Sequence, residues 1–151
     1  MIIKSLEQLN SISKKIADKV SNEDCIYLLG EIGSGKTTFS RYFINYLQKK
    51  EETEKTDVLS PTFNLLYEYE IKKIKIMHYD LYRLKNIDEI KQLGIFEEDI
   101  KSIKIIEWPE LLKEKIKDKI EIKFKYTKNE NERDITFSGN GKWKGFKLDA
   151  I

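Results

Sequence analysis

The segment GEIGSGKTT, at positions 30–38, contains the residues whose types and spacing most clearly specify a chemistry. Its glycines, lysine and first threonine satisfy the pattern G-x-x-x-x-G-K-[ST], with an additional glycine at position 33. Glycines let backbone N–H groups approach phosphate oxygens closely, and the N-terminus of a following helix adds positive potential. The segment therefore predicts a nucleotide phosphate-binding loop. Its predicted nucleotide-binding residues are Glu31, Ile32, Gly33, Ser34, Gly35, Lys36, Thr37 and Thr38.

Three side chains of this loop have expected roles. Lys36 would bridge the β- and γ-phosphates, the Thr37 hydroxyl would bind Mg²⁺, and Thr38 could donate to the α-phosphate. A purely structural glycine turn is the alternative. A short apolar run precedes the loop and a helical pattern follows it, which are the surroundings that the motif requires, so we interpret the segment as a nucleotide-binding loop.

A phosphate-binding loop also needs an acidic partner for its metal ion, and hydrolysis needs a positioned water. Two strand-like segments offer candidates, because residues 73–80 end at Asp80 and residues 102–108 contain Glu107. Strand alternation places Asp80 on the same face as His78. Either acid would lie at the carboxyl edge of the sheet, where open α/β folds bind ligands. The residues leave open which acid binds the metal or activates water, and an ordinary strand-end carboxylate is the alternative for each.

Three further residues have a functional and a structural interpretation. Thr62, in the segment SPTF at positions 60–63, could reach the γ-phosphate and the metal as a switch element, or could belong to a rigid turn. His78 is the only histidine, and it is either a half-buried, hydrogen-bonded strand residue or a general base. Trp108 follows Glu107 and is interpreted first as a core residue.

Hydrophobic periodicity predicts the elements that must position these residues. The expected strands cover residues 2–4, 24–29, 102–108, 119–126 and 133–138, and a hairpin around Lys72 and Lys73 joins two more. The expected helices begin after Ser5, after the phosphate-binding loop, after Asn86 and at Pro109, the last covering residues 109–115. Helices and strands alternate early while the end is strand-rich. We therefore expect one domain over residues 1–151, with a three-layer α/β P-loop NTPase fold and a mixed, partly antiparallel central sheet.

Composition narrows the class of protein. The 151 residues include 28 basic and 26 acidic residues, and a net charge of +2 dictates no type of partner. The lysine-rich stretch at positions 113–125 alternates with acids and apolar residues, which is typical of a solvated face, with an RNA-facing patch as the alternative. The lone Cys25 cannot form an internal disulfide and is expected in the core. No run approaches the roughly 20 apolar residues of a membrane span, so we expect a cytoplasmic protein without a membrane partner.

The small number of arginines bears on the type of reaction. Only Arg41, Arg83 and Arg133 occur, and no later segment carries the arginine-rich lid with which a small-molecule kinase would hold transferring phosphates. This favours an ATPase, a P-loop NTP hydrolase, over a kinase. The absence of an N-K-x-D guanine-reading motif favours ATP, while guanine remains open from the residues alone. The alternatives are a small P-loop kinase for a nucleoside or metabolite and a nucleotide-gated binding module with incidental hydrolysis.

Five segments, taken in order, resemble the bacterial TsaE (YjeE) family of small ATPases. They are GEIGSGKTTFSR, SPTF, HYDLYRL, LGIFEEDI and IIEWPELL. The resemblance runs from about Ile3 to Arg133, and its H-x-D-x-Y-R and E-W elements are more specific than the loop. Glu31, Ile32 and Ser34 stand where the family often has Asp, Leu and Ala, but the backbone rather than these side chains binds phosphate. The tail after Arg133 matches poorly and carries no functional expectation.

The resemblance implies a Mg²⁺-dependent ATPase required for threonylcarbamoyl modification of adenosine 37 in tRNA. ATP would be the bound nucleotide and ADP the product. The family docks on a TsaB–TsaD heterodimer, and hydrolysis is expected to reset that complex between cycles. Direct contact with tRNA and contact only through this complex both stay open, and the chain alone is expected to be a monomer.

Site residues carry over from the resemblance by position. Thr37 and Glu107 would hold Mg²⁺, with Asp80 as a Walker-B-like acid near the metal. Thr62 would occupy the switch position and complete the implied catalytic set of Glu107, Asp80 and Thr62. Trp108 would lie close to the nucleotide or to the partner surface. Arg133 would lie near the nucleotide, and Ser5 beside the adenosine.

Overall fold

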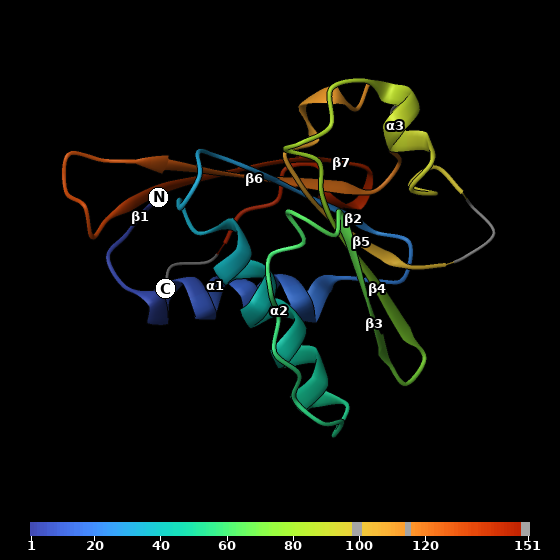
Figure 1. Cartoon of the computed structure of the whole chain (residues 1–151). Helices are drawn as coiled ribbons and strands as arrows, with labels where there is room; N and C mark the ends of the chain where they lie inside the picture. Colours follow the sequence, from blue (N-terminus) through green and yellow to red (C-terminus); the bar gives the residue numbers. More distant parts are fainter. Residues whose placement is uncertain (98–100, 114–115, 149–151) are drawn as a thin grey trace.

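The computed structural model describes residues 1–97, 101–113 and 116–148, and Figure 1 shows their arrangement. Within these ranges the strands are β1 (Ile2–Ile3), β2 (Cys25–Leu29), β3 (Leu66–Ile71), β4 (Ile74–Asp80), β5 (Ile103–Glu107), β6 (Lys119–Tyr126) and β7 (Arg133–Asn140). The α-helices are α1 (Leu6–Lys19), α2 (Lys36–Lys50) and α3 (Ile87–Lys91), and the short 3₁₀ turns are η1 (Pro109–Leu111) and η2 (Gly141–Trp143).

The strands form one sheet in the order β1-β7-β6-β2-β5-β4-β3. Strand β2 pairs in parallel with both β5 and β6, and β4 pairs in parallel with β5. The pairs β3–β4, β6–β7 and β1–β7 are antiparallel. The sheet is therefore mixed and partly antiparallel, as the sequence predicts.

Two apolar clusters lie on the two faces of this sheet. Helices α1 and α2 cover one face, and α3 lies over the other with η1 (Figure 1). Strand alternation divides β2 between them, because Ile26 and Leu28 belong to the first cluster while Cys25 and Tyr27 belong to the second. Cys25 is thus a core residue, as expected, and burial raises the pKa of its thiol to about 12. The result is the predicted three-layer α/β arrangement.

The predicted helix starts occur at the expected capping residues. The Ser5 hydroxyl accepts a hydrogen bond from the Gln8 N–H at 3.1 Å and begins α1. In the same way, the Asn86 side chain accepts from the Glu89 N–H at 3.0 Å and begins α3. These caps satisfy backbone donors that a helix leaves free in its first turn.

The predicted phosphate-binding loop connects β2 to α2 through a crowded turn. Gly30 has a φ of 146°, and a Cβ built there would lie 2.6 Å from the backbone oxygen of Phe124 in β6. Gly35 has a φ of 120° and immediately precedes α2. Both backbone conformations favour glycine, so the motif glycines fix the path of the chain from strand to helix.

The prediction of a helix over residues 109–115 is wrong for the described residues of that range. Among the described residues 109–113, a single 3₁₀ turn forms at Pro109–Leu111, since Leu112 is extended with φ −82° and ψ 118°. Extension at this point lets Leu111, Leu112 and Ile116 all pack against the second cluster. Residues 114–115 lie outside the described residues. The same holds for residues 98–100, the end of the segment LGIFEEDI.

Two findings concern the rest of the chain. Trp143, in the tail for which we had no functional expectation, is buried in the first cluster. Among the described residues, no helix is both long enough and apolar enough to cross a membrane.

Candidate nucleotide-binding site

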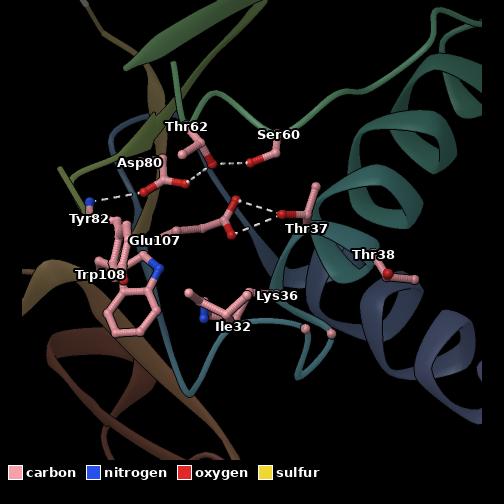
Figure 2. A pocket seen from close by; sticks show the side chains of 12 residues that line it. Ile32, Lys36, Thr37, Thr38, Ser60, Thr62, Asp80, Tyr82, Glu107 and Trp108 are labelled. Atoms are coloured by element: carbon pink, nitrogen blue, oxygen red, sulfur yellow. Dashed lines mark hydrogen bonds between the residues drawn. The ribbon is translucent and has the colours of Figure 1, made fainter. Parts of the chain in front are cut away.

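A pocket of about 250 Å³ opens where the phosphate-binding loop meets the carboxyl ends of β4 and β5 (Figure 2). On the loop side it is lined by Ile32, Gly33, Gly35, Lys36, Thr37 and Thr38. On the opposite side it is lined by Ser60, Thr62, Asp80, Tyr82, Glu107 and Trp108. The pocket therefore collects residues from the motif, the SPTF segment and both predicted strand ends.

Glu107 lies between the start of α2 and strand β4. The Thr37 hydroxyl donates to the Glu107 carboxylate, at 3.0 Å to Oε1 and 3.3 Å to Oε2. On the other side, Nε2 of His78 lies 2.6 Å from Glu107 Oε2. His78 is 0% exposed and Glu107 2% exposed, so the two contacts hold this carboxylate in a water-poor position. His78 is thus a fully buried partner of Glu107, more enclosed than the half-buried strand residue that was expected.

Asp80 lies next to Glu107 because β4 and β5 pair in parallel with these two residues in register. Its Oδ2 accepts a hydrogen bond from the Thr62 hydroxyl at 2.8 Å, and its Oδ1 accepts from the Tyr82 N–H at 2.9 Å. The hydroxyls of Thr62 and Ser60 lie 2.7 Å apart. Figure 2 shows the Glu107 carboxylate between Thr37 on one side and Asp80 with Thr62 on the other.

The Lys36 ammonium is folded back onto its own loop. It donates to the backbone oxygens of Gly30 and Glu31, the second at 3.0 Å. It also lies 4.2 Å from the ring centroid of Trp108. Desolvation lowers the pKa of Lys36, while the nearby carboxylates, Glu107 first, oppose that change. The site therefore holds a partly desolvated cation close to the carboxylates of Glu107 and Asp80.

Trp108 is half-buried, and it both packs against the second cluster and lines the pocket. Its φ of 59° turns the chain sharply after β5, and its N–H donates to the Leu28 carbonyl at 3.3 Å. Tyr82 packs against the indole with ring centroids 4.8 Å apart. An aromatic wall thus faces the loop across the pocket.

The oxygen donors of this site suit Mg²⁺. The Thr37 hydroxyl and the carboxylates of Glu107 and Asp80 are hard ligands, and Mg²⁺ is usually bound through one or two carboxylates plus substrate phosphates. Among the described residues, no group of three or more His, Cys, Asp or Glu side chains could hold a metal ion. These residues therefore fit a magnesium ion whose remaining ligands come from a bound nucleotide and water.

Four predicted nucleotide-binding residues do not line the pocket. The Glu31 carbonyl accepts from the Ser34 N–H at 3.2 Å, and the Ser34 side chain is buried behind the loop. Arg133 donates through Nε to the Ser34 carbonyl at 3.2 Å. Ser5 caps α1 and does not line the pocket. Nucleotide contacts by these side chains stay predictions.

Sequence reasoning missed Tyr126 and Tyr82. The Tyr126 hydroxyl donates to the Ile32 carbonyl at 2.8 Å, so it supports the loop from β6. The signal was present, because Tyr126 continues the alternation of Ile120, Ile122 and Phe124 and ends it with a polar tip. Tyr82 belongs to the segment HYDLYRL and was read only as part of that motif.

Comparisons with known proteins agree with this geometry. The family model described as "Threonylcarbamoyl adenosine biosynthesis protein TsaE" matches residues 3–135. A tRNA threonylcarbamoyladenosine biosynthesis protein TsaE from Rickettsia conorii is 41% identical over 112 residues, which are 74% of this chain and 61% of that protein. One from Bacillus subtilis is 31% identical over 137 residues, 89% of this chain and 82% of that protein.

A solved structure is similar over most of the chain. The crystal structure of Bacillus subtilis YdiB matches with a TM-score of 0.70 at 26% identity, covering 94% of this chain and 85% of that one. The chain aligns to less than two thirds of the length of the relatives from Rickettsia conorii and Rickettsia felis, 61% and 64%.

Proposed function

The chain belongs to the TsaE family of threonylcarbamoyl adenosine biosynthesis proteins, and from that premise we propose that it binds and hydrolyses ATP with Mg²⁺. The purpose of hydrolysis would be the threonylcarbamoyl modification of adenosine 37 in tRNA. The relatives carry that pathway in their names. ATP, magnesium and the partner complex are our proposals for this chain.

One observation carries the proposal. Thr37 of the phosphate-binding motif donates its hydroxyl to Glu107 Oε1 at 3.0 Å, and Asp80 is in register beside Glu107. Backbone donors and a lysine thus lie on one side of the pocket, and two carboxylates lie on the other. Binding a polyphosphate together with a divalent cation requires this division of charge.

The residues have separate roles in this scheme. Backbone N–H groups of the loop would hold the phosphates, and Lys36 would leave the carbonyls of Gly30 and Glu31 to neutralise the β- and γ-oxygens. Thr37 and Glu107 would hold Mg²⁺, which when bound polarises the phosphate oxygens. Asp80 would place a further carboxylate near the Mg²⁺ ion, or would orient the water that attacks the phosphate. Its bond to Thr62 would couple the segment at positions 60–63 to the reacting phosphate.

We propose a TsaB–TsaD pair as the partner. The test is a pull-down of the chain with purified TsaB and TsaD, with and without ATP and Mg²⁺, followed by measurement of phosphate release. We expect co-purification that depends on nucleotide, and faster hydrolysis in the presence of the pair. If the chain did not co-purify with the pair and the mixture released no phosphate, the proposal would be contradicted.

Two other functions are separated from this one by simple experiments. A small P-loop kinase would consume ATP in proportion to a phosphorylated nucleoside or metabolite, which a screen of acceptors would detect. A nucleotide-gated binding module would remain functional without hydrolysis. If Glu107→Gln retained ATP affinity and full activity in a reconstituted tRNA-modification assay while turnover vanished, the binding module would be the correct function.

A further inference from the structure

The hairpin of β6 and β7 ends beside the phosphate-binding loop. Tyr126 is the last residue of β6 and Arg133 the first of β7, and the two are paired in register. The Arg133 guanidinium lies 4.2 Å from the centroid of the Tyr126 ring. Two adjacent side chains from one end of the sheet therefore form a single stacked unit against the loop.

This stacked unit is bonded to alternate carbonyls of the loop. Tyr126 donates its hydroxyl to the Ile32 carbonyl at 2.8 Å, and Arg133 donates Nε to the Ser34 carbonyl at 3.2 Å. Arg133 also donates through Nη1 to the carbonyls of Glu130 and Glu132, each at 2.7 Å, in the turn before β7. These bonds anchor the guanidinium to its own strand while it holds the loop.

Because the peptide group is planar, the direction of each carbonyl also fixes the direction of the N–H group that follows it. In a trans peptide the C=O of one residue and the N–H of the next point in opposite directions. Because the carbonyls of Ile32 and Ser34 point to the hairpin, the N–H groups of Gly33 and Gly35 point away from it. Both glycines line the pocket, and neither N–H takes part in a hydrogen bond within the described part of the chain.

We propose that Tyr126 and Arg133 are positioning residues that orient two peptide planes of the loop, so that the Gly33 and Gly35 amides face the nucleotide phosphates. The inference rests on the proposed nucleotide site and deepens it. It gives Arg133 a role that differs from the one implied by the family resemblance, because the arginine acts through the Ser34 carbonyl instead of on phosphate.

The fit at Gly33 supports this arrangement. Its φ is 77°, and a Cβ built there would lie 3.0 Å from the Tyr126 hydroxyl oxygen. The additional glycine of the motif therefore makes room for the hydroxyl that holds the preceding carbonyl. A side chain at this position would press on that hydroxyl and disturb the peptide plane.

The orientation of the two N–H vectors can be measured without any nucleotide. We would record ¹H–¹⁵N residual dipolar couplings of the aligned protein for the wild type, Tyr126→Phe and Arg133→Lys. Tyr126→Phe keeps the ring beneath the guanidinium and removes only the hydroxyl donor, so the coupling of Gly33 should change while that of Gly35 does not. Arg133→Lys keeps the charge and removes the planar fork, so the coupling of Gly35 should change while that of Gly33 does not.

Affinity for ADP with Mg²⁺ provides the second readout, by calorimetry. Tyr126 is 44% exposed, so water competes for the Ile32 carbonyl, and we expect about threefold weaker binding in Tyr126→Phe. Arg133→Lys should weaken binding about tenfold, because the charge-assisted hydrogen bond from Nε to the Ser34 carbonyl is lost although the positive charge remains. If Arg133 acted through its charge on phosphate, lysine would retain most of the affinity.

The controls separate this proposal from the nucleotide site itself. Tyr69→Phe, in β3 at the far edge of the sheet, should change neither the two glycine couplings nor the affinity. A Gly33 coupling that stays at its wild-type value in folded Tyr126→Phe, or a Gly35 coupling that does so in folded Arg133→Lys, would overturn the proposal. A wild-type protein that binds no ADP would instead refute the proposed function, and the couplings would still decide whether the hairpin orients the loop. The two variants address different glycines, so either one that folds is sufficient for a decision.

Discussion

The Thr37 hydroxyl lies 3.0 Å from Oε1 of Glu107, although 70 residues separate the two in the chain. Strand pairing creates this proximity. Strands β2 and β5 are parallel neighbours with Leu28 opposite Glu107, so the end of β5 lies beside the loop that leaves β2. A motif threonine and a distant acid therefore meet at the sheet edge where open α/β folds bind ligands.

Lys36→Ala should weaken ATP binding by about tenfold to a hundredfold. The variant removes a charge-assisted phosphate contact in a partly desolvated site. Isothermal calorimetry measures the affinity, and circular dichroism checks the fold. Lys50→Ala is the matched control, since this exposed lysine ends the same helix and pairs with Asp18. ATP affinity that is equal in the two variants would contradict the role of Lys36.

The affinity for ATP should fall with rising pH before the ordinary lysine value of 10.5 is reached. Desolvation lowers the pKa of Lys36, so its ammonium loses its proton at a lower pH than an exposed lysine does. Only the protonated form attracts phosphate, and binding is therefore retained below that pKa and lost above it. Fluorescence or calorimetric titrations between pH 7 and 10 measure this. Lys36→Arg, which remains charged over this range, should remove most of the dependence.

Asp80→Asn should leave the fold intact and reduce Mg²⁺-dependent turnover on the order of a hundredfold. Asparagine can still accept from the Tyr82 N–H and can bond the Thr62 hydroxyl, but it lacks the negative charge. Phosphate release in the presence of the partner pair measures turnover, and Asp88→Asn, at an exposed position of helix α3, is the control. Wild-type turnover in Asp80→Asn would assign the metal role to Glu107 alone.

Gly30→Ala should lower the free energy of unfolding by about 3 kcal/mol or more. Its φ of 146° is unfavourable for alanine, and the new Cβ would lie 2.6 Å from the Phe124 backbone oxygen. Gly145→Ala has a similarly left-handed backbone, φ 72°, with nothing within 4 Å of a Cβ, and should cost only about 1 kcal/mol. Denaturant unfolding of both variants measures the difference. Equal losses would mean that the contact with β6 does not constrain the loop.

The sequence allowed much of this architecture to be predicted, because its signals are local. The capping residues Ser5 and Asn86 occur where two helices begin, and the motif glycines occur where the chain turns from β2 to α2. In the observed strands, side-chain alternation divides the apolar residues of β2, β4 and β5 between the two clusters. Local hydrogen bonds and side-chain periodicity determine such features, and both can be read in sequence.

Long-range pairing could not be predicted in the same way. Asp80 and Glu107 were separate candidates for one role, and only the parallel register of β4 and β5 places them side by side. The contact of Tyr126 with Ile32 joins residues 94 positions apart. The prediction of a helix at Pro109 was wrong for a related reason. Packing of Leu111 and Leu112 on the second cluster outweighs the local preference of these residues for a helix.

The most direct test of the account is a crystal structure of the protein with Mg²⁺ and a non-hydrolysable ATP analogue. The phosphates should lie within hydrogen-bond distance of the Gly33 and Gly35 amides and the Lys36 ammonium. The metal should contact the Thr37 hydroxyl with Glu107 or Asp80 nearby. A nucleotide bound elsewhere, with the loop at residues 30–38 free of phosphate, would contradict the central claim.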